Sequence, residues 1–322
     1  MSQTENTRRV RLERKVEEAE GIARFEFVCA DGGHLPGFSA GAHVDVMLAG
    51  GLTRQYSLCN APTDASRYVL GVLREPDSRG GSLAMHALNE GDEVHISAPR
   101  NHFPLVTGAS NSLLLAGGIG VTPILSMAES LEALGEAFEL HYCTRSRART
   151  AFMRRLADAP FAHRVHHHFD DGDAAQRCDI GALLKAQPAG THLYTCGPKG
   201  FMDAVLASAR ALGWPEANIH YEYFAGAPVE QAGDVAFDVQ LARTGKTVRV
   251  AADQSVAQAL AAAGVDVPVS CEQGVCGTCL TRVIDGTPDH RDMFLTDAER
   301  EANDQFTPCC SRAKGPLLVL DL

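Results

Sequence analysis

The sequence predicts a multidomain protein of mixed α/β and all-β class, with an antiparallel β-barrel, a parallel α/β domain and a C-terminal β-grasp domain. Three observations lead to this fold class. Short strand-like segments fill residues 10–104, strands and helices alternate over residues 112–212, and a cysteine-rich loop lies at residues 270–279. With 322 residues and 45% hydrophobic content, the chain can form two or three globular cores.

We place the domain boundaries where the composition changes. The run from Ala225 to Gly233 is rich in alanine, glycine and proline, which is typical of a linker. The predicted parts are a β-barrel domain (1–105), an α/β domain (106–226), a linker (227–233) and a cysteine-rich domain (234–322). The cysteine loop therefore belongs to the part that follows the linker.

Side chains in the first part alternate with the two-residue period of β-strands. The segments 25–29, 44–48 and 94–96 each place an apolar residue at every second position, as a strand with one buried face does. Glycine and proline residues separate these segments. Regularly spaced short strands of this kind predict a small antiparallel barrel.

One strand of this barrel, Arg54-Gln55-Tyr56-Ser57, combines a cation, an aromatic ring and a hydroxyl. An arginine can bind a phosphate, a tyrosine can lie along a ring system, and a serine can face the edge of that system. Exposed strands also carry such residues without any ligand. The segment therefore needs support from its neighbours.

That support comes from Arg79-Gly80-Gly81-Ser82, which precedes a predicted helix over residues 83–88. Glycines at the start of a helix leave backbone amides and the positive end of the helix dipole free for a phosphate. A simple turn with an N-cap has the same composition. Because both segments lie in one predicted barrel, we interpret them together as a site for a ring system that carries a phosphate.

The α/β part contains two glycine turns, each between a predicted strand and a predicted helix. The first, Gly117–Pro123, follows the buried strand 113–115 and precedes a helix that ends near Leu134. The second, Cys196-Gly197-Pro198, follows the strand 192–195 and precedes a helix over 199–212. Ligands of an open α/β sheet lie at the carboxyl ends of its strands, where such turns can hold a pyrophosphate. The first turn has neither the G-x-G-x-x-G spacing nor a Walker lysine.

The same part contains a run of histidines. Strands are predicted over residues 138–143 and 164–168, and helices near residues 151–156 and after Asp179. The second of these strands carries His166, His167 and His168, and His163 lies just before it. Consecutive residues of a strand point to opposite faces, so we expect no metal site at this run.

The cysteine loop has the spacing of an iron-sulfur ligand set. Cys271, Cys276 and Cys279 follow the pattern Cys-x4-Cys-x2-Cys, and a distant fourth cysteine completes the ligand spacing of a plant-type [2Fe-2S] cluster. Structural zinc sites usually combine two short Cys-x2-4-Cys knuckles, which this loop does not. By spacing alone, Cys309 and Cys310 both qualify as the fourth ligand.

Two other features of the loop agree with a cluster. Gly274 and Gly277 have no Cβ atom, so the backbone can approach inorganic sulfide closely and leave its amides free as donors. Leu280 follows Cys279 where c-type haem attachment requires a histidine, so that cofactor is excluded.

Charge and hydropathy exclude several functions. The net charge of −11 is unfavourable for nucleic acid and for anionic membrane surfaces, so we expect neither as a partner. No apolar run approaches the roughly 18 residues of a membrane-spanning helix. Residues 1–15 are polar and are not followed by the apolar segment of a secretory signal. We therefore expect a cytoplasmic protein with free thiols.

Together, these segments resemble the phthalate dioxygenase reductase family, and the resemblance covers essentially the whole chain. It is carried by Arg54-x-Tyr56-Ser57-x-Cys59-Asn60, Gly80-Gly81-Ser82, Gly117-Gly118-Ile119-Gly120-Val121-Thr122-Pro123, Cys196-Gly197-Pro198, Glu222-Tyr223-Phe224 and the cysteine loop. The resemblance implies an FMN-binding barrel, a nicotinamide-binding domain of the ferredoxin-NADP reductase type and a plant-type ferredoxin domain.

The resemblance also implies roles for individual residues. Flavin would be held by Arg54, Gln55, Tyr56 and Ser57, with Ser57 near N5, and its phosphate by Arg79, Gly80, Gly81 and Ser82. The nicotinamide cofactor would be bound by Gly118, Gly120, Val121, Thr122, Cys196, Gly197 and Pro198. Ser57, Cys196 and Phe224 are the expected catalytic residues, because Cys196 would lie near the transferred hydride and Phe224 would cover the flavin.

For the metal ligands, the family ending Cys-x-Ser-Arg-Ala-Lys corresponds to Cys309-Cys310-Ser311-Arg312-Ala313-Lys314. The resemblance therefore selects Cys271, Cys276, Cys279 and Cys309 as the ligands of the [2Fe-2S] cluster. It also implies NADH as the electron donor. Arg145 and Arg147 follow a strand where a ribose 2′-phosphate would lie, so NADPH is the alternative.

The resemblance implies a monomeric reductase component that carries electrons from NADH through FMN and the cluster to a Rieske-type aromatic oxygenase or demethylase. Flavin suits the position between NADH and the cluster because it accepts a hydride and releases electrons singly. The chain has no Cys-x-His pair, so we expect no Rieske centre of its own. The alternatives are a reductase for a cytochrome or a ferric chelate, and a non-enzymatic redox sensor.

Overall fold

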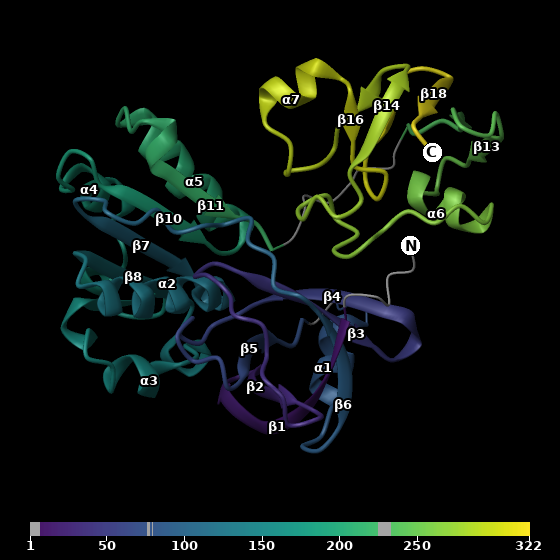
Figure 1. Ribbon diagram of the computed structural model, residues 1–322. Coiled ribbons are helices and arrows are strands. Elements are labelled where there is room, and N and C mark those ends of the chain that lie inside the picture. Colours follow the sequence, from purple (N-terminus) through teal and green to yellow (C-terminus); the bar gives the residue numbers. More distant parts are fainter. Residues whose placement is uncertain (1–6, 76–77, 79, 225–232) are drawn as a thin grey trace. The chain divides into compact units, whose positions relative to one another are not determined.

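A computed structural model describes residues 7–75, 78, 80–224 and 233–322 of the chain (Figure 1). The chain divides into two compact units, Met1–Phe224 and Ala225–Leu322. The first unit contains the β-barrel and the α/β domain, and the second contains the cysteine-rich domain, so the predicted fold class is confirmed. Arg79 and residues 227–232 of the predicted linker lie outside the described residues, and the domain boundaries stay predictions.

The barrel is a six-stranded antiparallel sheet with the strand order β4-β3-β6-β1-β2-β5. Its strands are β1 (Thr7–Ala19), β2 (Ile22–Cys29), β3 (His43–Leu48), β4 (Leu52–Ser57), β5 (Tyr68–Leu73) and β6 (Glu93–Ser97). A bridge between Leu58 and Leu70 joins the two edges of the sheet, so the sheet curves into a barrel. The predicted inward side chains of Phe25, Val44 and Val46 are fully buried. The helix α1 (Gly81–Ala87) follows β5.

The α/β domain contains a five-stranded parallel sheet with the strand order β11-β10-β7-β8-β9. Its strands are β7 (Ser112–Gly117), β8 (Phe138–Thr144), β9 (Val165–Phe169), β10 (His192–Cys196) and β11 (Ile219–Glu222). The helices are α2 (Val121–Leu134), α3 (Met153–Ala157), α4 (Ile180–Lys185) and α5 (Lys199–Ala211). Leu114 faces a core that includes α2, whereas Leu113 and Leu115 face a core that includes α5, which explains the continuous apolar run of β7.

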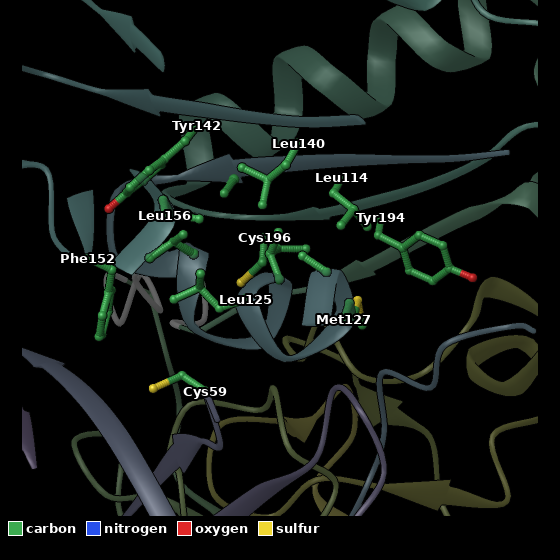
Figure 2. Packing of buried hydrophobic residues seen from close by; sticks show 14 of the residues in the cluster. Cys59, Leu114, Leu125, Met127, Leu140, Tyr142, Phe152, Leu156, Tyr194 and Cys196 are labelled. Carbon is green, nitrogen blue, oxygen red and sulfur yellow. The ribbon is translucent and has the colours of Figure 1, made fainter. Parts of the chain in front are cut away.

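The helix α2 is buried because it packs against the sheet and also against the barrel. Figure 2 shows Leu125 and Met127 of α2 below the sheet residues Leu114 and Leu140, with Cys59 of the barrel facing them from the other side. All of these residues belong to one hydrophobic cluster. The two domains therefore share a core, and their relative position within the first unit is set by packing.

The second unit has a mixed five-stranded sheet with the order β13-β12-β18-β14-β16 and a small β15-β17 ladder. The strands are β12 (Phe237–Leu241), β13 (Thr247–Val250), β14 (Thr281–Asp285), β15 (Pro288–Asp289), β16 (Gln305–Phe306), β17 (Arg312–Ala313) and β18 (Leu317–Leu320), and the helices are α6 (Val256–Ala262) and α7 (Asp297–Ala302). The parallel pairing of β12 with β18 and the position of α6 after the first hairpin give the predicted β-grasp arrangement.

The predicted elements are confirmed, and most of their ends differ by one or two residues, although β2 begins three residues earlier than predicted. A capping box of Ser255 and Gln258 begins α6. In the part of the chain that the structure describes, none of the helices has the length and apolar character needed to cross a bilayer.

Candidate functional site

The strand β4 and the start of α1 bring the two predicted phosphate-binding segments into contact. A Cβ atom on Gly81 would lie 2.7 Å from Nε and 2.9 Å from Cδ of Arg54, closer than van der Waals contact allows. The side chain of Arg54 therefore crosses the space that any other residue at position 81 would fill. Gly80 has a φ of 90°, a conformation that glycine adopts without strain. The structure thus brings the arginine and the two glycines of the predicted phosphate site together, and their role in binding a phosphate stays a prediction.

Other predicted flavin residues lie along the same strand. The ring of Tyr56 packs against the barrel core, and burial raises the pKa of its hydroxyl above the ordinary value. Ser57 is buried and pairs with His43 in β3. The hydroxyl of Ser82 accepts a hydrogen bond from the Glu75 amide (3.1 Å) and lies 2.9 Å from Oγ of Ser78. Ser82 is thus held by the segment that precedes α1.

The two glycine turns of the α/β domain touch each other at the carboxyl ends of the neighbouring strands β7 and β10. A Cβ atom on Gly120 would lie 2.6 Å from the amide nitrogen of Gly197, and a Cβ atom on Gly197 would lie 2.9 Å from Cα of Gly117. Only residues without a Cβ atom permit this approach. The structure therefore joins two turns that are far apart in the sequence into one edge, as the rule for open α/β sheets predicts.

The members of these turns differ in exposure. Gly118 and Gly197 are partly exposed and Pro198 is exposed, so they can face a ligand directly. Val121, Thr122 and Cys196 are buried in the hydrophobic cluster or beside it. The hydroxyl of Thr122 donates to the carbonyl oxygen of Ile119 (3.0 Å) and closes the turn. In this conformation the buried residues shape the turns.

A half-buried acid, Glu222, and a buried histidine, His43, lie between the flavin strand and the nicotinamide edge. Glu222 ends β11 and pairs in register with Cys196, and its Oε1 atom lies 3.9 Å from Nδ1 of His43. Among the described residues, its Oε2 atom has no hydrogen-bond partner. On the barrel side, Nε2 of His43 lies 3.2 Å from Nε2 of Gln55. Gln55, His43 and Glu222 therefore form a row of polar side chains from β4 to the end of β11.

Burial decides the charge of this pair. It raises the pKa of Glu222 to about 8 and lowers the pKa of His43 to about 4. Near neutral pH the carboxyl therefore keeps its proton and the imidazole is neutral. Burial, followed by the nearby Glu222, also raises the pKa of Cys196 well above its ordinary value. Sequence reasoning found Glu222 only as part of the motif that ends in Phe224, and it missed His43, which no motif marks.

Phe224 follows β11 and is 37% exposed, so its ring is accessible at the end of the first unit. Tyr221 and Tyr223 precede it in the sequence, and their rings pack edge to face with centroids 5.6 Å apart. An exposed aromatic ring at this place fits the predicted role of covering a flavin, and that role stays a prediction.

In the second unit, the four predicted cluster ligands converge. The sulfur of Cys271 is hydrogen-bonded by the thiols of Cys276 and Cys309, which lower its pKa, and Cys309 also contacts Cys279. The amide of Gln273 donates to the same sulfur over 3.3 Å. Thiol groups that converge in this way, with an amide donor to one sulfur, fit the donor set of a [2Fe-2S] cluster.

The structure distinguishes the two candidates for the fourth ligand. Cys310 is buried behind the loop, where its sulfur lies 3.3 Å from Oγ1 of Thr307 and in the space that a Cβ atom on Gly274 would fill. Cys309 instead contacts Cys271 and Cys279, as well as Cys310. These contacts favour Cys309 as the ligand.

The glycines of the loop are required by close packing. Gly277 has a φ of 68°, and a Cβ atom there would overlap the Phe294 ring, 2.6 Å from its Cε1 atom. Gly274 has a φ of 69°, and a Cβ atom there would lie 2.9 Å from Cα of Asp292. The amide of Met293 donates to the Gly274 carbonyl over 2.9 Å. The segment 292–294 therefore holds the loop in a conformation that only glycine tolerates at these two positions.

Known proteins share this architecture. The family described as 2Fe-2S iron-sulfur cluster binding domain matches residues 239–314, and the N-terminal domain of dimethylamine monooxygenase subunit DmmA-like proteins matches residues 97–219. Phthalate dioxygenase reductase from Burkholderia cepacia is 40% identical over 316 residues, which cover 98% of this chain and 97% of that protein. This chain belongs to the phthalate dioxygenase reductase family. The resemblance of the sequence is thus confirmed.

The fold of the reductase agrees with this family. A solved structure of phthalate dioxygenase reductase, described as a modular structure for electron transfer from pyridine nucleotides to [2Fe-2S], is similar with a TM-score of 0.79 and 39% identity, covering 98% of both chains. Vanillate O-demethylase oxidoreductase from Pseudomonas sp. strain HR199 is 58% identical over 305 residues, covering 94% of this chain and 96% of that protein. The reductase is therefore an electron-transfer oxidoreductase with a 2Fe-2S domain.

Proposed function

We propose that the reductase takes electrons from NADH at an FMN in the barrel and delivers them, through a [2Fe-2S] cluster, to an oxygenase component. The observation that carries this proposal is the presence of three sites in one chain: the Arg54 and Gly81 cradle, the paired glycine turns and the loop of converging thiols. Bound flavin would supply the change from two-electron to one-electron transfer, since it accepts a hydride and releases electrons singly.

In the barrel, we assign the flavin phosphate to Arg54 and to the segment that contains Gly80, Gly81 and Ser82. The guanidinium already lies against Gly81, so it needs no large movement to face a phosphate beside that glycine. Tyr56 and Ser57 lie further along the same strand and would contact the ring system. Gln55 would act through its contact with His43.

At the nicotinamide edge, Gly118, Gly120, Gly197 and Pro198 would bind the cofactor, with Val121, Thr122 and Cys196 shaping the turns. The neutral Glu222 lies at the same edge and has an oxygen without a hydrogen-bond partner among the described residues. An uncharged acid there can donate a hydrogen bond and does not repel a negatively charged cofactor. We propose NADH as the donor and a monomer as the working form.

The partner is proposed to be a Rieske-type aromatic oxygenase, and specifically an O-demethylase. The support is the 58% identity to a vanillate O-demethylase oxidoreductase over nearly the full length of both chains. In the second unit, residues 234–322 hold the thiol loop, whose ligands are proposed to be Cys271, Cys276, Cys279 and Cys309. Cys276 and Cys279 are both buried, so the oxygenase would contact the side chains around them.

The experiment is a reconstitution with separately purified oxygenase components. With NADH, the reductase should support vanillate turnover by a vanillate O-demethylase oxygenase much faster than phthalate turnover by a phthalate dioxygenase oxygenase. Reduction of ferric chelate or cytochrome c in the absence of an oxygenase measures the alternative function. Equal rates with ferric chelate and with both oxygenases would contradict a dedicated O-demethylase partner.

A further inference from the structure

A second group of metal-binding side chains lies on the parallel sheet, away from the cysteine loop in the sequence. His141 of β8, His168 of β9 and Cys178, which follows η6 (Ala174–Gln176), offer one donor atom each, and these three atoms lie within 4.8 Å of one another. Nδ1 of His141 is 2.9 Å from Nε2 of His168. His141 is buried, and the other two residues are partly buried.

Strand pairing brings these residues together. In the parallel pair of β8 and β9, His141 is in register with His166, and Cys143 is in register with His168. Residues two positions apart share a face of a sheet, so all four lie on the same face. The His166 ring stacks on His141 with centroids 4.6 Å apart. The thiol of Cys143 lies beside the thiol of Cys178.

The outer nitrogens of both histidines are oriented as metal-binding histidines require. Nδ1 of His168 is 3.1 Å from the carbonyl oxygen of Gln176, so this nitrogen carries the proton and Nε2 presents its lone pair inward. Nε2 of His141 faces Oε2 of Glu139 at 3.6 Å. Metal-binding histidines usually donate their outer N–H to a carbonyl or carboxylate oxygen, while the inner nitrogen binds the ion.

Without an ion, no neutral tautomer of His141 satisfies both neighbours. If the proton is on Nε2, two bare nitrogens face each other at 2.9 Å. If it is on Nδ1, a bare Nε2 faces the Glu139 carboxylate, and this buried atom has no hydrogen-bond partner among the described residues.

We propose that His141, His168 and Cys178 form a zinc site, with Glu139 and the Gln176 carbonyl as the partners of the outer nitrogens. A thiolate with two imidazoles is a donor set that suits zinc and does not suit magnesium or calcium. Two nitrogens bound tetrahedrally at the usual Zn–N distances would lie about 3.3 Å apart, so the present 2.9 Å needs only a small widening. Water completes the coordination.

The site would anchor an exposed segment to the sheet. Residues 173–177 are exposed, and Cys178 and the Gln176 carbonyl attach them to β8 and β9. The same segment leads into α4, which begins at Ile180. The ion would therefore have a structural role next to β8, the strand that leads to Arg145 and Arg147.

The same sheet offers a matched control. Nδ1 of His192 in β10 is 2.9 Å from Nε2 of His220 in β11, and the two rings stack with centroids 5.1 Å apart. Within the described ranges, no third donor joins this pair to form a metal-binding group. His192→Gln therefore removes a histidine pair of equal geometry without touching the proposed site.

The test uses the full chain with its iron and flavin bound. Zn2+ is added, unbound metal is removed, and zinc, iron and flavin are measured per chain. We expect one zinc in the parent protein and in His192→Gln, and its loss in His168→Gln and Cys178→Ser with unchanged iron and flavin. Unchanged iron and flavin show that these variants fold. Glu139→Gln should weaken zinc binding by about 10- to 100-fold.

Two further measurements decide the ligands. Zinc X-ray absorption should show nitrogen donors of imidazole together with one sulfur. Zinc coordinated by sulfur alone, or equal zinc in Cys178→Ser and His192→Gln, would overturn the proposal because the ion would then lie elsewhere. A disulfide between Cys143 and Cys178 in the purified protein, detected by mass spectrometry, would also overturn it.

Discussion

Gly81→Ala should weaken FMN binding by displacing Arg54. The new Cβ atom would lie 2.7 Å from Nε and 2.9 Å from Cδ of the arginine, and these atoms are in the middle of the side chain. Arg54 therefore has to leave its present position against α1. The proposed bond between the guanidinium and the flavin phosphate would be lost or badly aligned.

The size of the effect follows from that bond. A hydrogen bond to a charged group contributes about 1.5–3 kcal/mol, and each 1.4 kcal/mol is tenfold in affinity, so the Kd for FMN should rise by about 10- to 150-fold. Arg54→Ala should weaken FMN binding by a similar factor. The double variant should be little worse than either single one, because both changes remove the same interaction.

Titration of deflavinated protein with FMN, followed by the quenching of FMN fluorescence, measures this Kd. Gly37→Ala is the matched control in the same domain, since its Cβ atom would meet nothing within 4 Å and its φ is not positive. If Gly81→Ala binds FMN as tightly as Gly37→Ala while circular dichroism shows both folded, the cradle does not hold the phosphate.

Three further predictions concern the other sites. Glu222→Gln should reduce the pH dependence of stability. The pKa of Glu222 in the folded protein, about 8, lies above the ordinary 4.5, so the free energy of unfolding of the parent falls between these pH values, by about 1.4 kcal/mol per pH unit at most. If urea unfolding gives the parent and the variant the same dependence of this free energy on pH, the prediction is wrong. Cys309→Ser should lose the iron and the one-electron output to cytochrome c while flavin is still reduced by NADH, whereas Cys310→Ser should keep its iron. Iron analysis of the two variants decides between the ligands, and the reverse result would exchange their roles. Arg145→Ala with Arg147→Ala should leave kcat/KM for NADH nearly unchanged. A parent protein with a higher kcat/KM for NADPH than for NADH, and loss of that preference in the double variant, would show that NADPH is the natural donor.

The contact between Glu222 and His43 lies where the barrel and the α/β domain, which share a hydrophobic core, come together. The His43 side chain is buried and the Glu222 side chain is mostly buried, and Gln55 of the flavin strand contacts His43. A neutral acid in this position depends on burial. Loosening the core should therefore change the charge at the nicotinamide edge as well as the stability.

The sequence was informative wherever a few adjacent residues carry the chemistry. The cysteine spacing, the glycine turns and the Arg54–Ser57 strand are local patterns, and the structure places them on the elements that their periodicity predicts. Their fold class and family are confirmed. The reason is that turn conformation and strand periodicity depend mainly on neighbouring residues in the chain.

Tertiary structure decided which distant residues meet. Within one strand, His166, His167 and His168 gave no reason to expect a metal site. Parallel pairing of β8 with β9 places His141 beside His168, and the segment after β9 brings Cys178 close to both. In the same way, the pairing of Glu222 with His43 and the different positions of Cys309 and Cys310 arise from contacts across the fold. Periodicity shows which face a side chain takes, whereas strand order and core packing determine what lies opposite it.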